Sequence, residues 1–277
     1  MSSVTRIICL ANSRKYKERC IAGINPKTGQ WIRPISRNNP NNGGVPESVR
    51  LIEGNEPALL ELLEIPLENE GADFGFALEN QWIVPGVWRK VGKVKPSDVI
   101  RYCINYPYIL HNPYKYVSVP FIQKMPKQER RTLQLVYARK LLLKAESNTK
   151  GGITWKGTIK TANGQYLSDI PITDPELEKK LTSGSQPQDA CLVTVSLGLP
   201  HKPHDRWEGD DPCWKLIARV IELTEADQIL AEMQRLNWSI DRGREYLWRN
   251  FKVRSRSELS STELTSFLNY LKSLPQP

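Results

Sequence analysis

The sequence predicts a mainly β protein with α-helical additions, built as two five-stranded barrels in tandem followed by a small C-terminal helical domain. Three observations predict this fold. Short strings recur along the chain, each half shows the same order of strand and helix patterns, and the C-terminal segment changes to helical spacing with capping residues. We expect the first barrel in residues 1–98, a connection in 99–130, the second barrel in 131–222 and the helices in 223–277.

The tandem arrangement is predicted from four pairs of similar strings. They are WRKVGKV (88–94) with WKLIARV (214–220), TGQWIRPI (28–35) with NGQYLSDI (163–170), ALLELLEIPL (58–67) with ACLVTVSLGL (190–199), and PESVRLI (46–52) with PELEKKL (175–181). Their offsets differ by only a few residues, as expected if loops alone changed length. Because self-similarity of this kind outranks local propensity, it indicates a tandem duplication. In this alignment Trp88 corresponds to Trp214, and we expect both to plug or rim the core of a barrel.

Each half divides into the same order of elements. In the first half, strand patterns at 4–11 and 19–25 flank a basic loop, a third strand follows at 30–36, and strands at 59–65 and 88–94 come after a short helix. The second half repeats this order at 132–143, 153–161, 165–173, 175–181, 191–197 and 214–223. Three strands, a helix and two strands form the order of an OB-fold, a small and partly open Greek-key barrel.

The remaining segments connect the barrels and extend the C-terminus. Residues 99–130 are rich in tyrosine and proline, which predicts an extended connection with one or two short elements. Residues 223–277 have apolar side chains at helical spacing, and we expect them to form a separable three-helix unit. Three side chains are placed to cap its successive helices: Thr224, Ser239 and Ser260.

The charge of the chain is unevenly distributed. The net charge is +9, yet residues 51–90 carry 8 acidic against 2 basic side chains. Residues 1–50 carry 9 basic against 2 acidic side chains, and residues 91–145 carry 11 against 2. This segregation predicts one basic surface backed by an acidic one, and it favours a polyanionic partner. A basic surface that meets only solvent is the simpler alternative.

Other features of the sequence favour the cytoplasm. The chain has five scattered cysteines, an odd number, which we interpret as reduced and mostly buried thiols. Its first residues, MSSVTRIICLAN, lack the basic region and long apolar core of a secretory signal. No apolar run approaches the ~18 residues of a membrane span. We therefore expect a cytoplasmic protein with no membrane partner.

Several strings resemble a known family. CLANSRKYKERCIAG, WIRPIS, PITDPELE and CWKLIARVIEL together resemble bacterial and archaeal proteins with a dual OB-containing domain, over about residues 4–222. The resemblance implies tandem OB-folds and nucleic-acid binding, and it implies no established reaction. The string LNWSIDRGREYLWRNFKVRSRSELSSTELTSFLNYL resembles a three-helix module that is appended to bacterial DNA-recombination and single-strand annealing proteins.

The candidate binding residues follow from how OB-folds hold single strands. The strand lies across the second and third strands of the barrel, between the first and penultimate loops, where cations contact phosphates and aromatic rings stack on bases. Trp31 and Arg33 share one face of the third strand, and we expect the exposed face because arginine is rarely buried unpaired. The second barrel has the weaker pair Tyr166 and Ser168. The first barrel is thus the candidate site, and its first loop adds Asn12, Ser13, Arg14, Lys15, Lys17 and Arg19.

Two groups of candidates have a structural alternative. Asn12 and Ser13 fit ordinary turn chemistry equally well. In the tail, a group of cations could contact phosphates, although acidic residues elsewhere leave the tail nearly neutral. This group consists of Arg242, Arg244, Arg249, Lys252, Arg254 and Arg256.

The sequence lacks the signatures of common catalytic sites. It has no phosphate-cradling glycine loop, no Walker lysine and no glycine-flanked nucleophilic serine. His201, His204 and Cys213 lie within thirteen residues and are residue types that bind zinc, but their spacing matches no established zinc module. The run that contains them is interpreted more simply as a long loop. We expect no catalytic residue, no metal and no cofactor.

Three functions remain open from the sequence. The first is non-catalytic binding of single-stranded DNA or RNA through the first barrel. The second is an enzyme or modified-base reader acting on nucleic acid, with the acidic residues at 205–211 or the segment 12–14 as its site. The third is a protein-interaction adaptor in a recombination, mobile-element or defence complex, with the C-terminal helices as its docking module.

Overall fold

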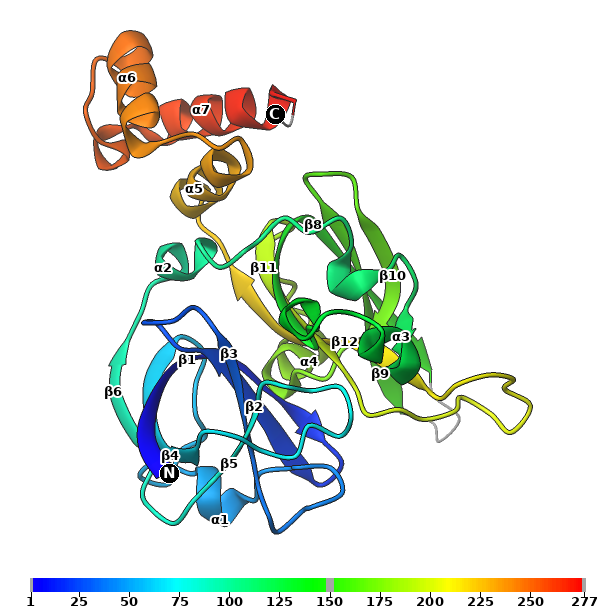
Figure 1. The fold of residues 1–277 in the computed structure, drawn as a ribbon. Coiled ribbons are helices and arrows are strands. Elements are labelled where there is room, and N and C mark those ends of the chain that lie inside the picture. Colours follow the sequence, from blue (N-terminus) through cyan, green and yellow to red (C-terminus); the bar gives the residue numbers. More distant parts are fainter. Residues whose placement is uncertain (1, 148–151, 276–277) are drawn as a thin grey trace.

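The structure, a computed structural model, describes residues 2–147 and 152–275. Two curled six-stranded sheets lie next to each other, and the C-terminal helices extend from one end of the pair (Figure 1). The prediction of a mainly β protein with helical additions is confirmed. Each sheet contains the five predicted strands and one further short strand.

The first sheet has the strand order β5-β3-β2-β1-β4-β6. Its elements are β1 (Ser2–Lys15), β2 (Glu18–Ile24), β3 (Trp31–Ile35), α1 (Glu47–Arg50), β4 (Glu61–Glu68), β5 (Asn80–Trp82) and β6 (Arg89–Lys93). The strand that was not predicted is β5, which pairs in parallel with β3. Buried and half-buried residues alternate along β4, as expected for a strand with one face in the core. The core of this barrel includes Ile7, Ile21, Leu63 and Trp88.

The second sheet has the strand order β10-β9-β8-β11-β12-β7. Its elements are β7 (Tyr116–Ser118), β8 (Leu133–Ser147), β9 (Ile153–Thr161), β10 (Tyr166–Pro171), α4 (Pro175–Thr182), β11 (Cys191–Leu197) and β12 (Pro212–Glu222). Here the additional strand is β7, which pairs with the start of β12. Every residue of β11 is buried. The reason is that one face of β11 lies in the core of its own barrel, while Leu192 on the other face packs against the first half.

The segment between the sheets is more structured than the sequence predicted. It contains α2 (Pro96–Ile100), η1 (Ile109–His111), α3 (Val119–Gln123) and η2 (Lys127–Glu129), as well as β7. Val99 and Ile100 of α2 are buried among residues of both barrels. The connection is therefore part of the packed body.

The tail contains the three predicted helices. They are α5 (Glu225–Arg235), α6 (Ile240–Phe251) and α7 (Ser261–Ser273), with η3 (Arg256–Glu258) between the last two. The side chains of Thr224, Ser239 and Ser260 each accept a hydrogen bond from the backbone N–H three residues later, so the predicted caps are confirmed. The helices enclose their own apolar cluster, which includes Phe267 and Leu271.

The outer face of the first sheet is covered by the second half. Ala11 and Ala22 of the first sheet pack against Leu133 and Ala218 of the second. A larger cluster joins apolar residues of both sheets to α2 and to Ala231 of α5. We call this covered region the seam.

The two halves repeat one another down to a strand irregularity. The pairing of β4 with β6 shifts between Leu62 and Leu63, and the pairing of β11 with β12 shifts at the corresponding place, between Thr194 and Val195. Counted from these bulges, Trp88 corresponds to the next residue, Lys215, rather than to Trp214. The alignment of the two tryptophans was therefore wrong by one residue.

This shift places the two tryptophans on opposite faces. Trp88 is buried in the core of the first barrel, as expected, whereas Trp214 is only half-buried and faces outward. The inward position in the second barrel belongs to Lys215, whose side chain is fully buried. Its Nζ donates hydrogen bonds of 2.6 Å to the carbonyl oxygens of Ile109 and Asn112, which ties the connection to β12. Burial lowers the pKa of Lys215 to about 7.

Candidate functional site

The basic stretch that was expected to be a loop is a β-hairpin. β1 continues to Lys15, β2 begins at Glu18, and these two residues pair directly. The turn consists of Tyr16 and Lys17, with Tyr16 in the left-handed region at φ 53°. The strands thus continue through most of the predicted loop, which makes the hairpin a defined support for its side chains.

Asn12 and Ser13, which both belong to this hairpin, have structural hydrogen-bond partners. The Asn12 amide donates to Glu56 Oε2 at 3.1 Å and to the Pro57 carbonyl at 3.0 Å. Ser13 is buried, and its hydroxyl donates to the Cys20 carbonyl across the two strands. Both side chains fix the hairpin to its surroundings.

The four cations of the hairpin differ in how far they are neutralised. Arg14 forms an ion pair with Glu178 of α4, and Arg19 lies 3.9 Å from Glu56. Lys15 and Lys17 have no ion-pair partner within the described part of the chain. Lys17 is exposed, whereas Lys15 is half-buried. Burial lowers the pKa of Lys15, so a nearby anion would stabilise its charged form.

Trp31 and Arg33 do not lie on an open surface. They share the outer face of β3, because Ile32 between them points into the barrel core. However, this face lies in the seam, where the second half covers it, so the expectation that Arg33 is exposed was wrong. Arg33 is only 5% exposed, and Trp31 is half-buried against apolar residues of both halves. The buried guanidinium is compensated by Glu79, whose Oε1 lies 2.8 Å from Nη1.

Beside the seam lies a cavity of about 420 Å³, which we call the inter-barrel groove. The first half contributes the hairpin and the segment at 74–77, and the second half contributes the end of β11 and the start of β12. The groove therefore adjoins the first loop and the penultimate loop of the first barrel, which are the loops that flank ligands in OB-folds. Its lining residues are Ser13, Arg14, Lys15, Tyr16, Cys20, Arg33, Phe74, Phe76, Ala77, Ser196, Leu197, Gly198, Leu199, His201, Trp214 and Leu216.

The lining of this groove combines cations with aromatic rings. Arg14 and Lys15 lie on one wall and Trp214 and His201 on the other, and none of the described residues that line the groove is acidic. The Trp214 ring packs against neighbouring rings, with its centroid 5.4 Å from that of Tyr116. Its indole N–H donates to the His201 carbonyl at 3.2 Å. The ring is thus held in place where it lines the groove.

Sequence reasoning did not select Trp214 and Phe74 for this site. Trp214 was interpreted as a core residue because it was aligned with Trp88. Phe74 lies in a loop without periodic pattern. The available signal was positional, since both residues lie at or next to the loop before the closing strand, which contributes to ligand sites in OB-folds.

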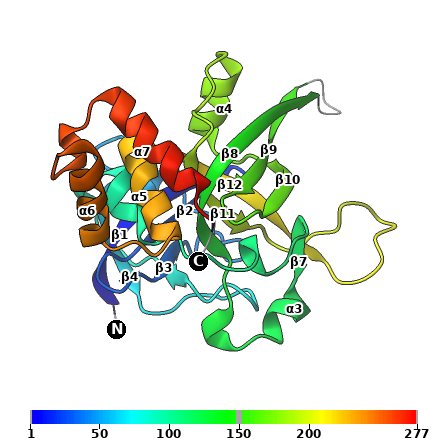
Figure 2. The same cartoon turned by 90° about the horizontal axis from the view of Figure 1, so that it is seen from above.

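The three candidate zinc ligands do not converge. Cys213 is fully buried in the core of the second barrel, whereas His201 and His204 are exposed on the loop at 198–211. This loop projects beyond β7 at the edge of the second sheet (Figure 2). Within residues 2–147 and 152–275, no three His, Cys, Asp or Glu side chains are grouped to hold a metal ion.

The candidate cations of the tail lie apart from the groove, on and after α6 at the far end of the molecule (Figure 1). Arg244 and Arg249 form ion pairs with acidic residues of the same helix. Arg242 lies over the Trp238 ring at 4.4 Å, and Arg254 over the Trp248 ring at 5.6 Å. The structure therefore does not bring these cations together with the hairpin.

Comparison with known proteins identifies the family. The profile of the dual OB-containing domain family matches residues 5–220. This chain belongs to that family. The match covers both sheets and ends before α5, so the C-terminal helices are a module appended to the dual OB domain.

A short stretch of the dual OB protein is similar to a curated relative. A stretch of 46 residues is 46% identical to the uncharacterized protein slr1353 of Synechocystis sp., a match that covers 17% of this chain and 16% of that protein. No solved structure matches the chain. Among the residues that the structure describes, no helix has the length and apolar character needed to cross a membrane.

Proposed function

We propose that this dual OB protein binds single-stranded nucleic acid in the inter-barrel groove and does so without catalysing a reaction. The observation that supports this most is the composition of the groove, in which hairpin cations face aromatic rings without an acidic residue in the lining. Cations of this kind contact phosphates, and exposed rings stack on bases irrespective of sequence. Single strands fit better than duplexes, because only unpaired bases offer their faces to the rings.

The two walls of the groove would contribute to binding in different ways. Lys15 forms no ion pair within the described part of the chain and is half-buried, so a phosphate beside it would gain a charge-assisted hydrogen bond. Trp214 is fixed by its indole N–H and by neighbouring rings, so it can accept a base with little loss of side-chain entropy. Binding would therefore combine a salt-dependent contribution from the hairpin with a stacking contribution from β12.

Fluorescence anisotropy with labelled DNA and RNA strands of about 12 nucleotides tests this proposal. Lys15→Ala and Trp214→Ala are expected to weaken binding, the latter by about 1–3 kcal/mol if one base stacks on the ring. Lys93→Ala and Tyr166→Ala are matched controls, since both side chains are exposed and lie outside the groove lining.

Thermal unfolding of each variant shows whether it is folded. Absence of single-strand binding by the native protein would overturn the proposal. So would equal affinity in folded Lys15→Ala, Trp214→Ala and control variants. Stronger binding of a duplex of the same sequence would exclude the stacking role of Trp214.

A further inference from the structure

We propose that the protein has a second nucleic-acid site, a groove beside the connection between the barrels that takes a further single-stranded segment. The inference rests on the proposed function for its ligand class, but on different residues. The groove has a volume of about 640 Å³, and we call it the connection groove. The two grooves meet at Arg33 and its partners. Arg33 lines the inter-barrel groove, and its partners Glu79 and Thr132 line the connection groove.

The charge of the connection groove favours an anionic ligand. Its lining contains four cations and one acidic residue, Glu79, which is already paired with Arg33. The cations are Arg101, Lys127, Arg130 and Arg131. None of them forms an ion pair with a described acidic side chain.

The hydrogen bonds of these cations leave their charge in place. Arg130 donates to the carbonyl oxygens of Met125 and Gln123, and Arg131 donates to that of Glu129. These acceptors are neutral, so both guanidinium groups are positioned without being neutralised. The Nε of Arg131 is buried and has no hydrogen-bond partner among the described residues. Arg101 and Lys127 are exposed.

The aromatic residues of the groove favour a nucleic acid over a simple polyanion. Trp31, Tyr102 and Tyr106 all belong to the lining. The Arg101 guanidinium lies 4.9 Å from the centre of the Tyr102 ring, and that of Arg131 lies 3.6 Å from the centre of the Tyr106 ring. Stacked pairs of this kind present flat, positively charged surfaces, on which unpaired bases stack.

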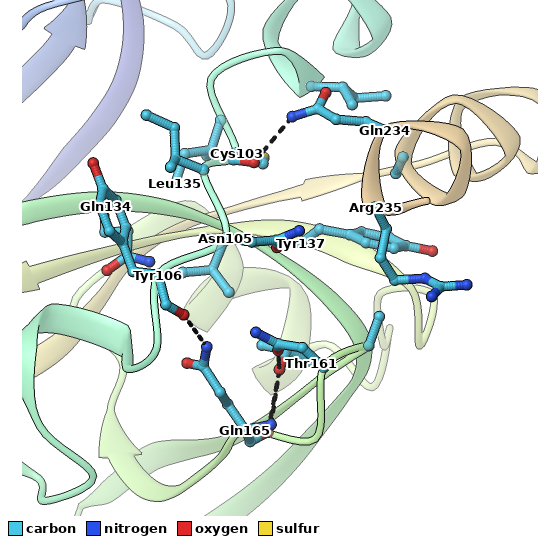
Figure 3. A pocket seen from close by; sticks show the side chains of 16 residues that line it. Cys103, Asn105, Tyr106, Gln134, Leu135, Tyr137, Thr161, Gln165, Gln234 and Arg235 are labelled. Carbon is cyan, nitrogen blue, oxygen red and sulfur yellow. Dashed lines mark hydrogen bonds between the residues drawn. The ribbon is translucent and has the colours of Figure 1, made fainter. Parts of the chain in front are cut away.

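The part of the connection that contains Tyr102 and Tyr106 is held by hydrogen bonds from neighbouring elements (Figure 3). Gln165 of the β9–β10 hairpin donates to the Tyr106 carbonyl at 2.5 Å, and Gln234 of α5 donates to the Cys103 carbonyl at 3.0 Å. The space left behind this part of the connection is only about 30 Å³, the size of one water molecule. Because these hydrogen bonds fix the backbone of the connection, the positions from which Tyr102 and Tyr106 enter the groove are set before a ligand arrives.

Binding stoichiometry tests the second site. Isothermal titration with a single strand of about 4 nucleotides, the smallest site size of an OB-fold, is expected to give two strands bound per protein. Arg101→Ala/Lys127→Ala should bind one strand, because it removes two cations of the connection groove. Both side chains are exposed, and Arg101 contacts its neighbour Tyr102, so thermal unfolding checks that the variant is folded. Lys93→Ala/Lys179→Ala removes the same charge from exposed positions outside both grooves and should still bind two.

A longer strand that reaches both grooves supplies a second measurement. Loss of two phosphate contacts should reduce the slope of log affinity against log salt by about 1.4 in Arg101→Ala/Lys127→Ala. One strand bound by the native protein, together with an unchanged slope in this variant, would overturn the second site. If Lys15→Ala and Trp214→Ala have no effect but Arg101→Ala/Lys127→Ala abolishes binding, the inter-barrel proposal fails and the connection groove remains.

Discussion

Arg33 and Glu79 form an ion pair of 2.8 Å in the seam, with side chains only 6% and 10% exposed. Arg33 belongs to β3, and Glu79 precedes β5 in the same half. Arg33 also donates to the hydroxyl of Thr132, the residue before β8, at 3.0 Å. The pair therefore links the first sheet to the beginning of the second. It also lies between the two grooves, because Arg33 lines the inter-barrel groove and Glu79 lines the connection groove.

Replacing Arg33 by alanine is expected to lower the free energy of unfolding by about 3–5 kcal/mol, because Glu79 would keep a buried charge without its partner. Arg37→Ala is the matched control, since Arg37 pairs with Glu68 on the surface. Solvent screening leaves such a pair little net effect on stability. Urea denaturation measures both variants. Equal losses would contradict the structural role of Arg33.

Much of the fold could be predicted because its signals are local. The Asn-Gly turn before β10 and the hydroxyl caps of α5, α6 and α7 each depend on a few neighbouring residues. The strand order followed from the repeated pattern of apolar segments. The short strands β5 and β7 gave no signal, because three residues are too few to show alternation.

The candidate site was harder to predict, since it depends on how two halves pack. An unpaired arginine would have to be exposed, but Arg33 is paired with Glu79, which is distant in the sequence. Trp214 was misplaced for a different reason. The similar strings align the two tryptophans, but the closing strands have their bulges at corresponding places, and counting from these bulges shifts the correspondence by one residue. A shift of one residue turns a side chain to the other face of a strand.

The contact of α5 with the second sheet predicts an effect of pH on stability. Glu232 is fully buried and pairs with Arg139 of β8 and with Arg235. Burial raises the pKa of Glu232, but the hydrogen bonds from the two arginines outweigh this effect and hold the pKa below its usual value. The stabilisation is therefore complete above about pH 4.5, the ordinary value for an unfolded glutamate, and is lost as the pH falls through the lower folded value.

Glu232→Gln is expected to be less stable than the native protein by about 3–5 kcal/mol at pH 7, because two arginines lose their buried counter-charge. The difference should shrink as the pH falls below about 4.5, since the unfolded state of the native protein then binds a proton at Glu232 before the folded state does. Denaturant midpoints of both proteins between about pH 7 and pH 3 measure this difference on both sides of the ordinary glutamate pKa of 4.5. A constant difference across the range would contradict the assigned pKa direction.

Truncation after Glu222 is expected to leave both sheets folded but less stable. The sheets have their own cores, whereas Leu223 and Ala231 of the tail cover part of the seam cluster. Exposure of these apolar contacts should lower the melting temperature while the β-type circular dichroism is kept. If the truncated protein loses its native spectrum, the tail is an integral part of the core and not a separable module.

The salt dependence of binding should separate the four cations of the hairpin. Replacing Arg14, Lys15, Lys17 and Arg19 together by alanine should weaken binding to all single strands and flatten the slope of log affinity against log salt. Each phosphate contact contributes roughly −0.7 to this slope. Arg14 and Arg19 already face Glu178 and Glu56, so their contribution to the field at the groove is partly cancelled.

Lys15→Ala/Lys17→Ala should therefore reproduce most of the effect of the fourfold variant, with a decrease in slope of about 1.4. Arg14→Ala/Arg19→Ala removes the same formal charge from the same hairpin and should change the slope much less. Anisotropy titrations at several salt concentrations measure all three variants. If the two arginines flatten the slope as much as the two lysines, their ion pairs open on binding, and the unpaired lysines have no special role in holding the phosphates.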